Sequence, residues 1–293
     1  MSEAHLTAQS GLAPAIQAWE YFLYDQGRSP NTVKAFLSDV RLLAKYLPPD
    51  RTLGAVTTSD LNNFLHWLEG ERGVPCSPKS LARRATSIKS FFRWLQRGGV
   101  LVSDPGEKVV QRSVLSPLPE VLSEAEIEAA LLAADRHRRQ SKPDARPYTL
   151  LSLLLATGVK KSECLGIHLN HISLDDPEGP LVFIRYASPS NRYKERKLTL
   201  PEDWVPAFEE YLVQYNPPDR LFPWSPRRLE YLLEDIGNEA GLPKHLSFDM
   251  CRWTSVLQDY VNNVEHEKIR QKLGVSKIQW REINMKLRQL AGG

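Results

Sequence analysis

The segment Thr157–Leu165 reads TGVKKSECL and follows the apolar run Tyr148–Ala156. This run has the length and composition of a helix, and Gly158 can end that helix because glycine adopts left-handed backbone conformations without steric cost. A second helix is expected to begin near Lys161. The resulting corner between two helices presents charged side chains of both signs, namely Lys160, Lys161 and Glu163.

The size and composition of the chain are those of an ordinary soluble protein. Its 293 residues are enough for two domains, each with its own core. The hydrophobic content of 42% and the charged content of 25% both fit this class. A net charge of +3 is too small to indicate a polyanionic partner. Whether the chain binds a polyanion depends more on how its charges are distributed.

The cysteines and the apolar segments exclude several classes of protein. Cys76, Cys164 and Cys251 are far apart and form no CxxC pair, which argues against a disulfide framework or a zinc site and fits a reducing cytosol. The first fifteen residues lack the pattern of a signal peptide, and no apolar run reaches the roughly 20 residues that span a bilayer. We therefore expect a cytoplasmic protein with no metal, no cofactor and no membrane partner.

The first third of the chain predicts a compact bundle of four amphipathic helices. The first covers Ala13–Gln26, and the others are expected to begin at three serine-containing pairs that suit helix starts. These pairs are Ser29-Pro30, Ser59-Asp60 and Ser77-Pro78.

The fourth of these helices carries basic residues with no acidic residue among them. They are Lys79, Arg83, Arg84, Lys89, Arg93 and Arg97. A solvated helix face usually mixes the two signs. A stripe of one sign opposite an apolar stripe is what a helix needs to lie against phosphates. A basic face that serves only solubility remains the alternative.

The rest of the chain predicts helices around a small sheet. Ser123-x-x-Glu126 is a capping box that opens a helix through Ala134. Three short strands are expected at His171–Leu174, Leu181–Arg185 and Arg196–Leu200. Later helices are expected at Pro201–Tyr215, from Ser225-Pro226, and at Phe248–Val261, Val264–Leu273 and Ser276–Leu290. Arg227 and Arg228 oppose the dipole of the helix that Ser225 caps, so an external anion would stabilise them.

Two segments resemble the tyrosine recombinases, the phage-integrase and Xer family: LLSLLLATGVKKSECLGIHLNHISL and SPKSLARRATSIKSFFRWLQRGGVLVSDPGEKV. The resemblance extends from about Ala13 to Leu290. It implies a mainly α fold with a small antiparallel sheet, built as a helical core-binding domain (1–110), a linker (111–119) and a catalytic-type domain (120–293). It also implies double-stranded DNA as the partner, enclosed by the two domains, and adds Lys34 of the second helix as a contact.

In this family a tyrosine attacks a DNA phosphate that two arginines stabilise, while a lysine and histidines transfer protons. The resemblance places Lys160 where the first arginine belongs, and Glu163 matches the acidic residue that orders the site. The catalytic lysine of the hairpin turn falls on Asn191. Arg192 and Lys194 are close to this position but out of register.

The remaining catalytic positions also depart from the family pattern. The motif DMCRW retains Arg252 but has Asp249 in place of histidine, and the Leu-Gly-His motif ends in Val275. The nucleophile position falls on Asn284, and no tyrosine follows Tyr260. A carboxamide cannot serve as the covalent nucleophile.

These departures predict a catalytically degenerate homologue that binds double-stranded DNA without cutting it, in an architectural, maintenance or regulatory role near the nucleoid. A recombinase with a relocated nucleophile and a protein-interaction module are the alternatives. A homo-oligomer, or an active recombinase as partner, is compatible with the resemblance. The predicted DNA contacts are Lys34, Lys79, Arg83, Arg84, Lys89, Arg93, Lys160, Lys161, Arg192, Lys194, Arg227, Arg228, Lys244 and Arg252.

Arg252 has two possible roles in a site that does not cleave DNA. It can hold a phosphate together with Lys160, or it can pair with Glu163 and Asp249 inside the protein. We favour the phosphate, because Lys160 keeps a positive charge beside Asp249. Whether the last helix passes to a neighbouring subunit, as it does in the family, stays open.

Overall fold

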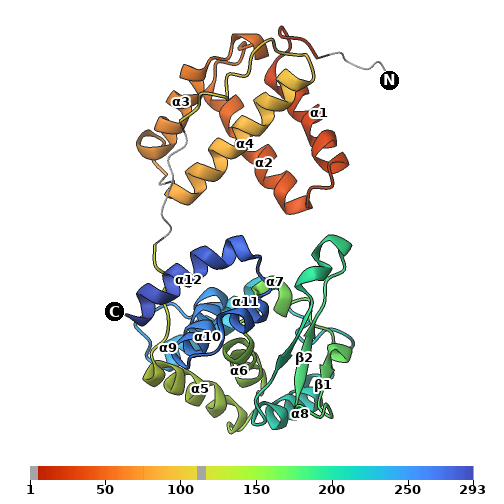
Figure 1. The fold of residues 1–293 in the computed structure, drawn as a ribbon, viewed down its shortest axis with the longest axis vertical. Coiled ribbons are helices and arrows are strands. Elements are labelled where there is room, and N and C mark those ends of the chain that lie inside the picture. The colour runs from red at the N-terminus through yellow and green to blue at the C-terminus, as the bar shows by residue number, and fades with distance from the viewer. Residues whose placement is uncertain (1–5, 75, 111–116, 293) are drawn as a thin grey trace. The chain divides into compact units, whose positions relative to one another are not determined.

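The computed structural model describes residues 6–74, 76–110 and 117–292. The chain divides into two compact units, Met1–Pro117 and Leu118–Gly293, each with its own hydrophobic core (Figure 1). Most of the predicted linker, residues 111–116, lies outside the described residues. Among the described helices, none is long and apolar enough to cross a membrane.

The first unit is a bundle of helices, as predicted. Ser29 and Ser77 cap α2 and α4 by accepting hydrogen bonds from the backbone amides of Thr32 and Ser80. The third helix begins earlier than predicted, because Thr57 rather than Ser59 forms a reciprocal capping box with Asp60. The helices are α1 (Leu12–Asp25), α2 (Pro30–Tyr46), α3 (Thr58–His66, continued by a π turn at Trp67–Glu71) and α4 (Pro78–Arg97).

The second unit contains helices around a three-stranded antiparallel sheet of order β1-β2-β3. Its strands are β1 (Ile172–Ser173), β2 (Leu181–Ile184) and β3 (Arg196–Thr199), shorter than predicted. Its helices are α5 (Glu124–Arg138), α6 (Arg146–Thr157), α7 (Lys161–Cys164), α8 (Trp204–Tyr215), α9 (Pro226–Glu239), α10 (Phe248–Val261), α11 (His266–Leu273) and α12 (Lys277–Ala291). The capping box at Ser123 opens α5, which runs one turn beyond the predicted end at Ala134.

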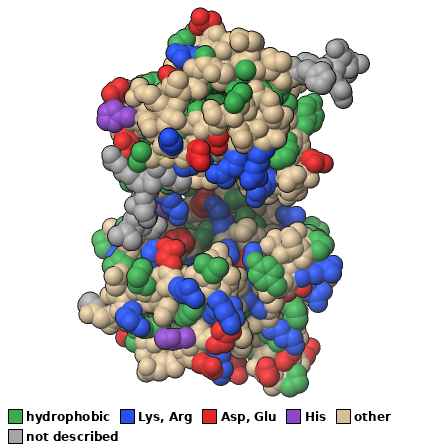
Figure 2. Space-filling model, turned by 45° about the horizontal axis from the view of Figure 1, so that its top comes forward, with side chains coloured by type: hydrophobic (Ala, Val, Ile, Leu, Met, Phe, Trp, Pro, Cys, Tyr) green, Lys and Arg blue, Asp and Glu red, His purple; other side chains and the backbone are tan. Residues whose placement is uncertain are grey.

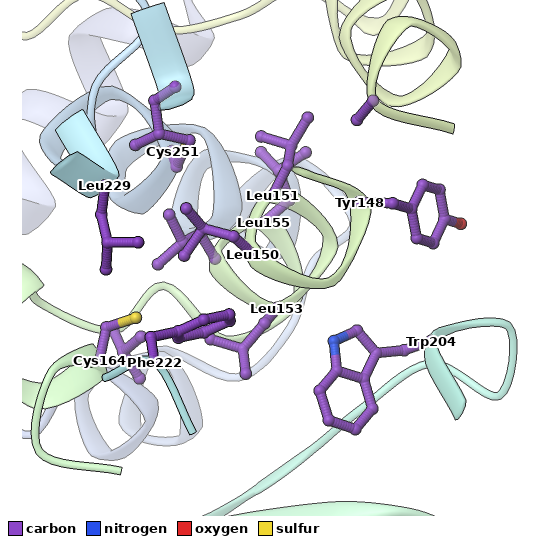
Figure 3. Close-up of a cluster of buried hydrophobic side chains, with 14 of the residues drawn as sticks. Tyr148, Leu150, Leu151, Leu153, Leu155, Cys164, Trp204, Phe222, Leu229 and Cys251 are labelled. Atoms are coloured by element: carbon purple, nitrogen blue, oxygen red, sulfur yellow. The ribbon is translucent and has the colours of Figure 1, made fainter. Parts of the chain in front are cut away.

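Helix α6 lies at the centre of this second core, because its side chains are apolar on nearly every side. Helices α5, α8 and α10 pack around it. Figure 3 shows Leu150, Leu151, Leu153 and Leu155 in this cluster, with Trp204 beside them. The indole Nε1 of Trp204 donates to the Thr149 carbonyl at 2.9 Å, which satisfies its polar atom inside the core. This bond ties α8 to the first turn of α6.

The last helix, α12, packs against α10 of the same chain. Its Leu287 is fully buried among Val256, Ile269 and Leu273. The segment that the family passes to a neighbour thus covers an apolar surface of its own unit in this structure.

Candidate functional site

The predicted corner has the predicted geometry. Gly158 ends α6 with φ of 59°, and α7 begins at Lys161. The backbone amide of Lys160 donates to Glu163 Oε2 at 2.8 Å. The carboxylate of Glu163 therefore fixes the start of α7 and with it the position of Lys160.

Glu163 is buried and forms an ion pair with Arg196 of β3. Nη1 of Arg196 lies 3.2 Å from Oε1, and Nη2 lies 3.0 Å from Oε2. The hydroxyl of Tyr186 also donates to Oε1. Burial opposes ionisation of Glu163, but these donors outweigh it and lower the pKa of the carboxyl. The role of Arg196 was not predicted, because the sequence indicates this residue only as the start of the third strand.

Arg196 also bonds to the main chain at both sides of the site. Its Nε donates to the carbonyl of Lys272 at 2.6 Å, and its Nη1 donates to that of Lys194 at 3.1 Å. A Cβ at Gly274 would lie 2.7 Å from Nη1, and Gly274 has φ of 60°. Glycine is therefore required here for space as well as for conformation. One guanidinium joins α7, the hairpin and the end of α11.

Arg252 bonds to two other carbonyls at helix ends. It donates through Nη1 to Gly158 O and through Nη2 to Leu273 O, the latter at 3.0 Å. Cations are favourable at these positions because the helix C-terminus carries partial negative charge. Among the described residues neither Glu163 nor Asp249 accepts a hydrogen bond from Arg252, so the structure does not favour internal carboxylates, the alternative to a phosphate, as its partners. Burial lowers the pKa of Arg252 to about 10, and the group remains protonated at neutral pH.

A pocket of about 980 Å³ opens beside this corner. Its wall brings together several predicted residues: Lys160, Lys161, Arg227, Asp249 and Arg252. Burial lowers the pKa of Lys160, and the nearby charges of Arg252, Lys194 and Arg196 lower it further against the opposing effect of Glu163. Lys160 therefore lies close to several other cations at this corner.

The pocket also contains residues that the sequence analysis missed. They are Glu230, Tyr231, Glu234 and His245. Glu230 pairs with Lys161 at 2.6 Å, and Arg227 Nε donates to the hydroxyl of Tyr231 at 2.7 Å. The positions 227, 230, 231 and 234 on one face of α9 were the available signal, since this spacing places side chains together.

The hairpin turn carries its cation at Lys194. The Nζ of Lys194 donates to Asn191 Oδ1 at 2.9 Å and lies 5.1 Å from the centre of the Tyr193 ring. Arg192 is exposed in the 3-10 turn Pro189–Lys194. Asn191 thus supports a lysine three residues further along the chain.

Other predicted residues lie outside the wall of the pocket. Val275 is buried in the cluster below α12, and Tyr260 stacks on His266 with ring centres 5.2 Å apart. Asn284 has a buried Oδ1 that accepts no hydrogen bond from the described residues. Lys244 is bound to Glu126 Oε2 at 2.7 Å and to the Val121 carbonyl at 2.9 Å.

The basic helix α4 is only partly free to bind a ligand. Arg83 is paired with the buried Asp39, and the Ser87 hydroxyl donates to the same carboxylate at 2.8 Å. Burial outweighs these partners and raises the pKa of Asp39. Lys89 Nζ donates to the Val109 carbonyl at 3.1 Å. Arg84 is partly buried, with Nε 3.8 Å from Asp39.

Three further basic residues of α4 are exposed and share a face: Lys79, Arg93 and Arg97. They have no ion-pair partner within the described ranges. Lys34 of α2 is exposed as well. Lys and Arg side chains gather on one part of the surface of the first unit in Figure 2.

Each of the two units matches a known protein family. The family described as "Phage integrase, N-terminal SAM-like domain" matches residues 16–99, and the one described as "Phage integrase family" matches residues 120–283.

Curated relatives match over part of the chain. The tyrosine recombinase XerC of Mycobacterium tuberculosis (strain ATCC 25177 / H37Ra) is 35% identical over 156 residues, which cover 52% of this chain and 51% of the relative. XerC of Mycobacterium sp. (strain JLS) is 31% identical over 157 residues, with the same coverage of 52% and 51%. The chain therefore spans about half the length of the curated relatives it matches.

Solved structures share the fold at low sequence identity. XerH site-specific recombinase bound to a palindromic difH substrate has a TM-score of 0.73 at 18% identity, covering 88% of this chain and 77% of that chain. A lambda integrase tetramer bound to a Holliday junction has a TM-score of 0.74 at 14% identity, covering 94% and 77%.

The buried ion pair makes a testable prediction about stability. Glu163→Gln leaves Arg196 buried without its counter-charge, so we expect a loss of about 3–5 kcal/mol in the free energy of unfolding at pH 7. Because folding lowers the pKa of Glu163, its stabilisation is present above its unfolded pKa and is lost as the pH falls through the folded value. Urea unfolding from pH 2 to 7 should therefore show the variant and the parent converging in acid. Glu202→Gln, at an exposed position, is the control; equal losses for both variants would contradict the assignment.

Proposed function

Because the chain belongs to the phage integrase family of tyrosine recombinases, we propose that it binds double-stranded DNA and does not cleave it. The observation that supports this proposal is the composition of the pocket. Arg252 and Lys160 line it and suit a phosphate, whereas Asn284, at the expected nucleophile position, is not among the residues of its wall. These features support the retention of positive charge where a phosphate would bind, beside an asparagine at the expected nucleophile position.

The two cations would hold a phosphate in different ways. Arg252 is fixed by two main-chain carbonyls, so its remaining N–H groups would bind without loss of conformational freedom. Lys160 provides a point charge that lacks the planar fork of arginine. Asp249, in the same wall, places a carboxyl group where its charge would repel the phosphate. This combination favours binding of an unreacted phosphodiester over stabilisation of a transition state.

The relatives support DNA as the partner. The solved XerH and lambda integrase neighbours are bound to DNA, and the exposed face of α4 offers the charge that a phosphate backbone needs. An architectural or regulatory role would follow from binding without cleavage. A module that binds only proteins would instead show no salt-dependent affinity for DNA.

One observation favours a second candidate, a recombinase with a relocated nucleophile. Tyr231 lines the pocket, is 42% exposed and accepts a hydrogen bond from Arg227. Its oxygen would attack the phosphorus, the 5′ oxygen would leave with a proton, and a phosphotyrosyl bond would form. Tyr231 is on α9, whereas the tyrosine of the family is expected on the last helix, so we regard non-cleaving binding as the better supported function.

The first test concerns covalent chemistry. DNA fragments selected by the protein from a genomic library would be nicked to trap a covalent intermediate and then analysed in denaturing gels. We expect no covalent complex, because Asn284 cannot attack phosphorus. Asn284→Tyr should also remain inactive, since Asp249 and Asn191 do not restore proton transfer. An adduct that disappears in Tyr231→Phe would establish the second candidate.

The second test concerns the exposed face of α4. Replacing Lys79, Arg93 and Arg97 with alanine should weaken binding to every DNA sequence. Each lost phosphate contact should reduce the slope of log K against log salt by about 0.9. Lys89→Ala is the matched control, because its ammonium already bonds to main-chain carbonyls and should change the slope less. A triple variant with the slope of the parent would show that this face does not meet DNA.

A further inference from the structure

Helix α5 exposes an apolar residue between two opposite charges. Glu128, Leu132 and Arg136 are spaced four residues apart, so they share one face of the helix. Leu132 is 51% exposed, and both charged residues are exposed as well. Within the described residues neither Glu128 nor Arg136 has an ion-pair partner. The opposite face of α5 is buried in its own unit through Ala130, Ala133 and Ala134, so the exposed face has no role in that core.

A groove of about 720 Å³ runs beside this face. Residues from the first to the last turn of α5 line it, over about 22 Å of helix at 1.5 Å per residue. Ile127, Leu131 and Pro206 give it an apolar wall. Glu124 lies near one end, and Arg139 lies near the other, paired with Asp135 of α5. Asp135 neutralises much of this basic end, so the charge asymmetry of the surface depends on Glu128 and Arg136 of the exposed face.

This pattern is complementary to itself. If two α5 helices lie antiparallel around a twofold axis at Leu132, the two leucines meet. Glu128 of each copy then faces Arg136 of the other. An isologous interface requires this property, since the same patch must serve both partners. DNA does not fit the acidic half of the groove, and a helix of a single charge sign would be repelled by one of its ends.

We propose that α5 is a contact between two copies of this chain, packed antiparallel through Leu132. None of the α5 residues lines the pocket around Arg252, so the proposed phosphate site stays open in such a dimer. The area buried between one pair of short helices is at or below the roughly 1,200 Å² that the smallest stable interfaces bury. The dimer is therefore weak in solution. Two copies bound to one DNA would associate far more readily because their effective concentration is high.

Charge reversal tests the proposed pairing. Sedimentation equilibrium of the full chain would be compared for the parent, Glu128→Arg, Arg136→Glu and the double variant. Each single variant creates two like-charge pairs across the axis and should weaken self-association at least about tenfold. The double variant restores both pairs with their signs exchanged and should return to within about threefold of the parent, since opposite charges again meet across the axis. Glu209→Arg makes the same charge change at an exposed position of α8 and should have no effect.

Disulfide trapping gives an independent measurement. Leu132→Cys should oxidise rapidly to a covalent dimer, because the two cysteines meet at the axis. Val213→Cys, on α8 and 86% exposed, is the control. A parent that stays monomeric up to high concentration, a double variant that does not recover, or Leu132→Cys that cross-links no faster than the control would each overturn the proposal. Failure to bind DNA would overturn the proposed function and leave these measurements unaffected.

Discussion

The ion pair between Arg196 and Glu163 determines the geometry of the second unit's functional corner. Both side chains are buried, so removing either one would leave a charge without compensation in the interior. Glu163 fixes the start of α7 through the amide of Lys160, while Arg196 reaches the carbonyls of Lys194 and Lys272. The hairpin, α7 and α11 are segments distant in sequence, and this pair is what brings them into one arrangement.

Arg252 has a structural role besides any contact with a phosphate. Its guanidinium satisfies carbonyls at the ends of α6 and α11, and it also lines the pocket. The sequence leaves a phosphate and internal carboxylates as its possible partners, and in the structure its hydrogen bonds go to main-chain oxygens. A structural use and a phosphate-binding use are compatible, because five N–H donors are available. The residue would therefore persist in a non-cleaving protein for two reasons.

Local signals in the sequence predicted the helix starts well. Ser29, Ser77, Ser123 and Ser225 cap the expected helices because each bonds to an amide only three residues away. Thr57 was missed because Ser59 is an equally good cap by type, and only packing decides between them. Partners such as Arg196 with Glu163 or Arg83 with Asp39 lie more than thirty residues apart, and no periodicity encodes them. Tyr231 and His245 were missed for the same reason, since a pocket forms from distant segments.

In the function we propose, the pocket holds an intact DNA phosphate beside Lys160. The most direct measurement replaces single phosphates of a selected site with uncharged methylphosphonates and compares the parent with Lys160→Met. At one phosphate in each bound half-site, neutralisation should weaken the parent about tenfold, the value of one charged hydrogen bond. The same neutralisation should cost the variant little, because its lysine charge is already absent. Equal losses for both proteins at every phosphate, or scission of the DNA at the phosphate that Lys160 contacts, would contradict the account.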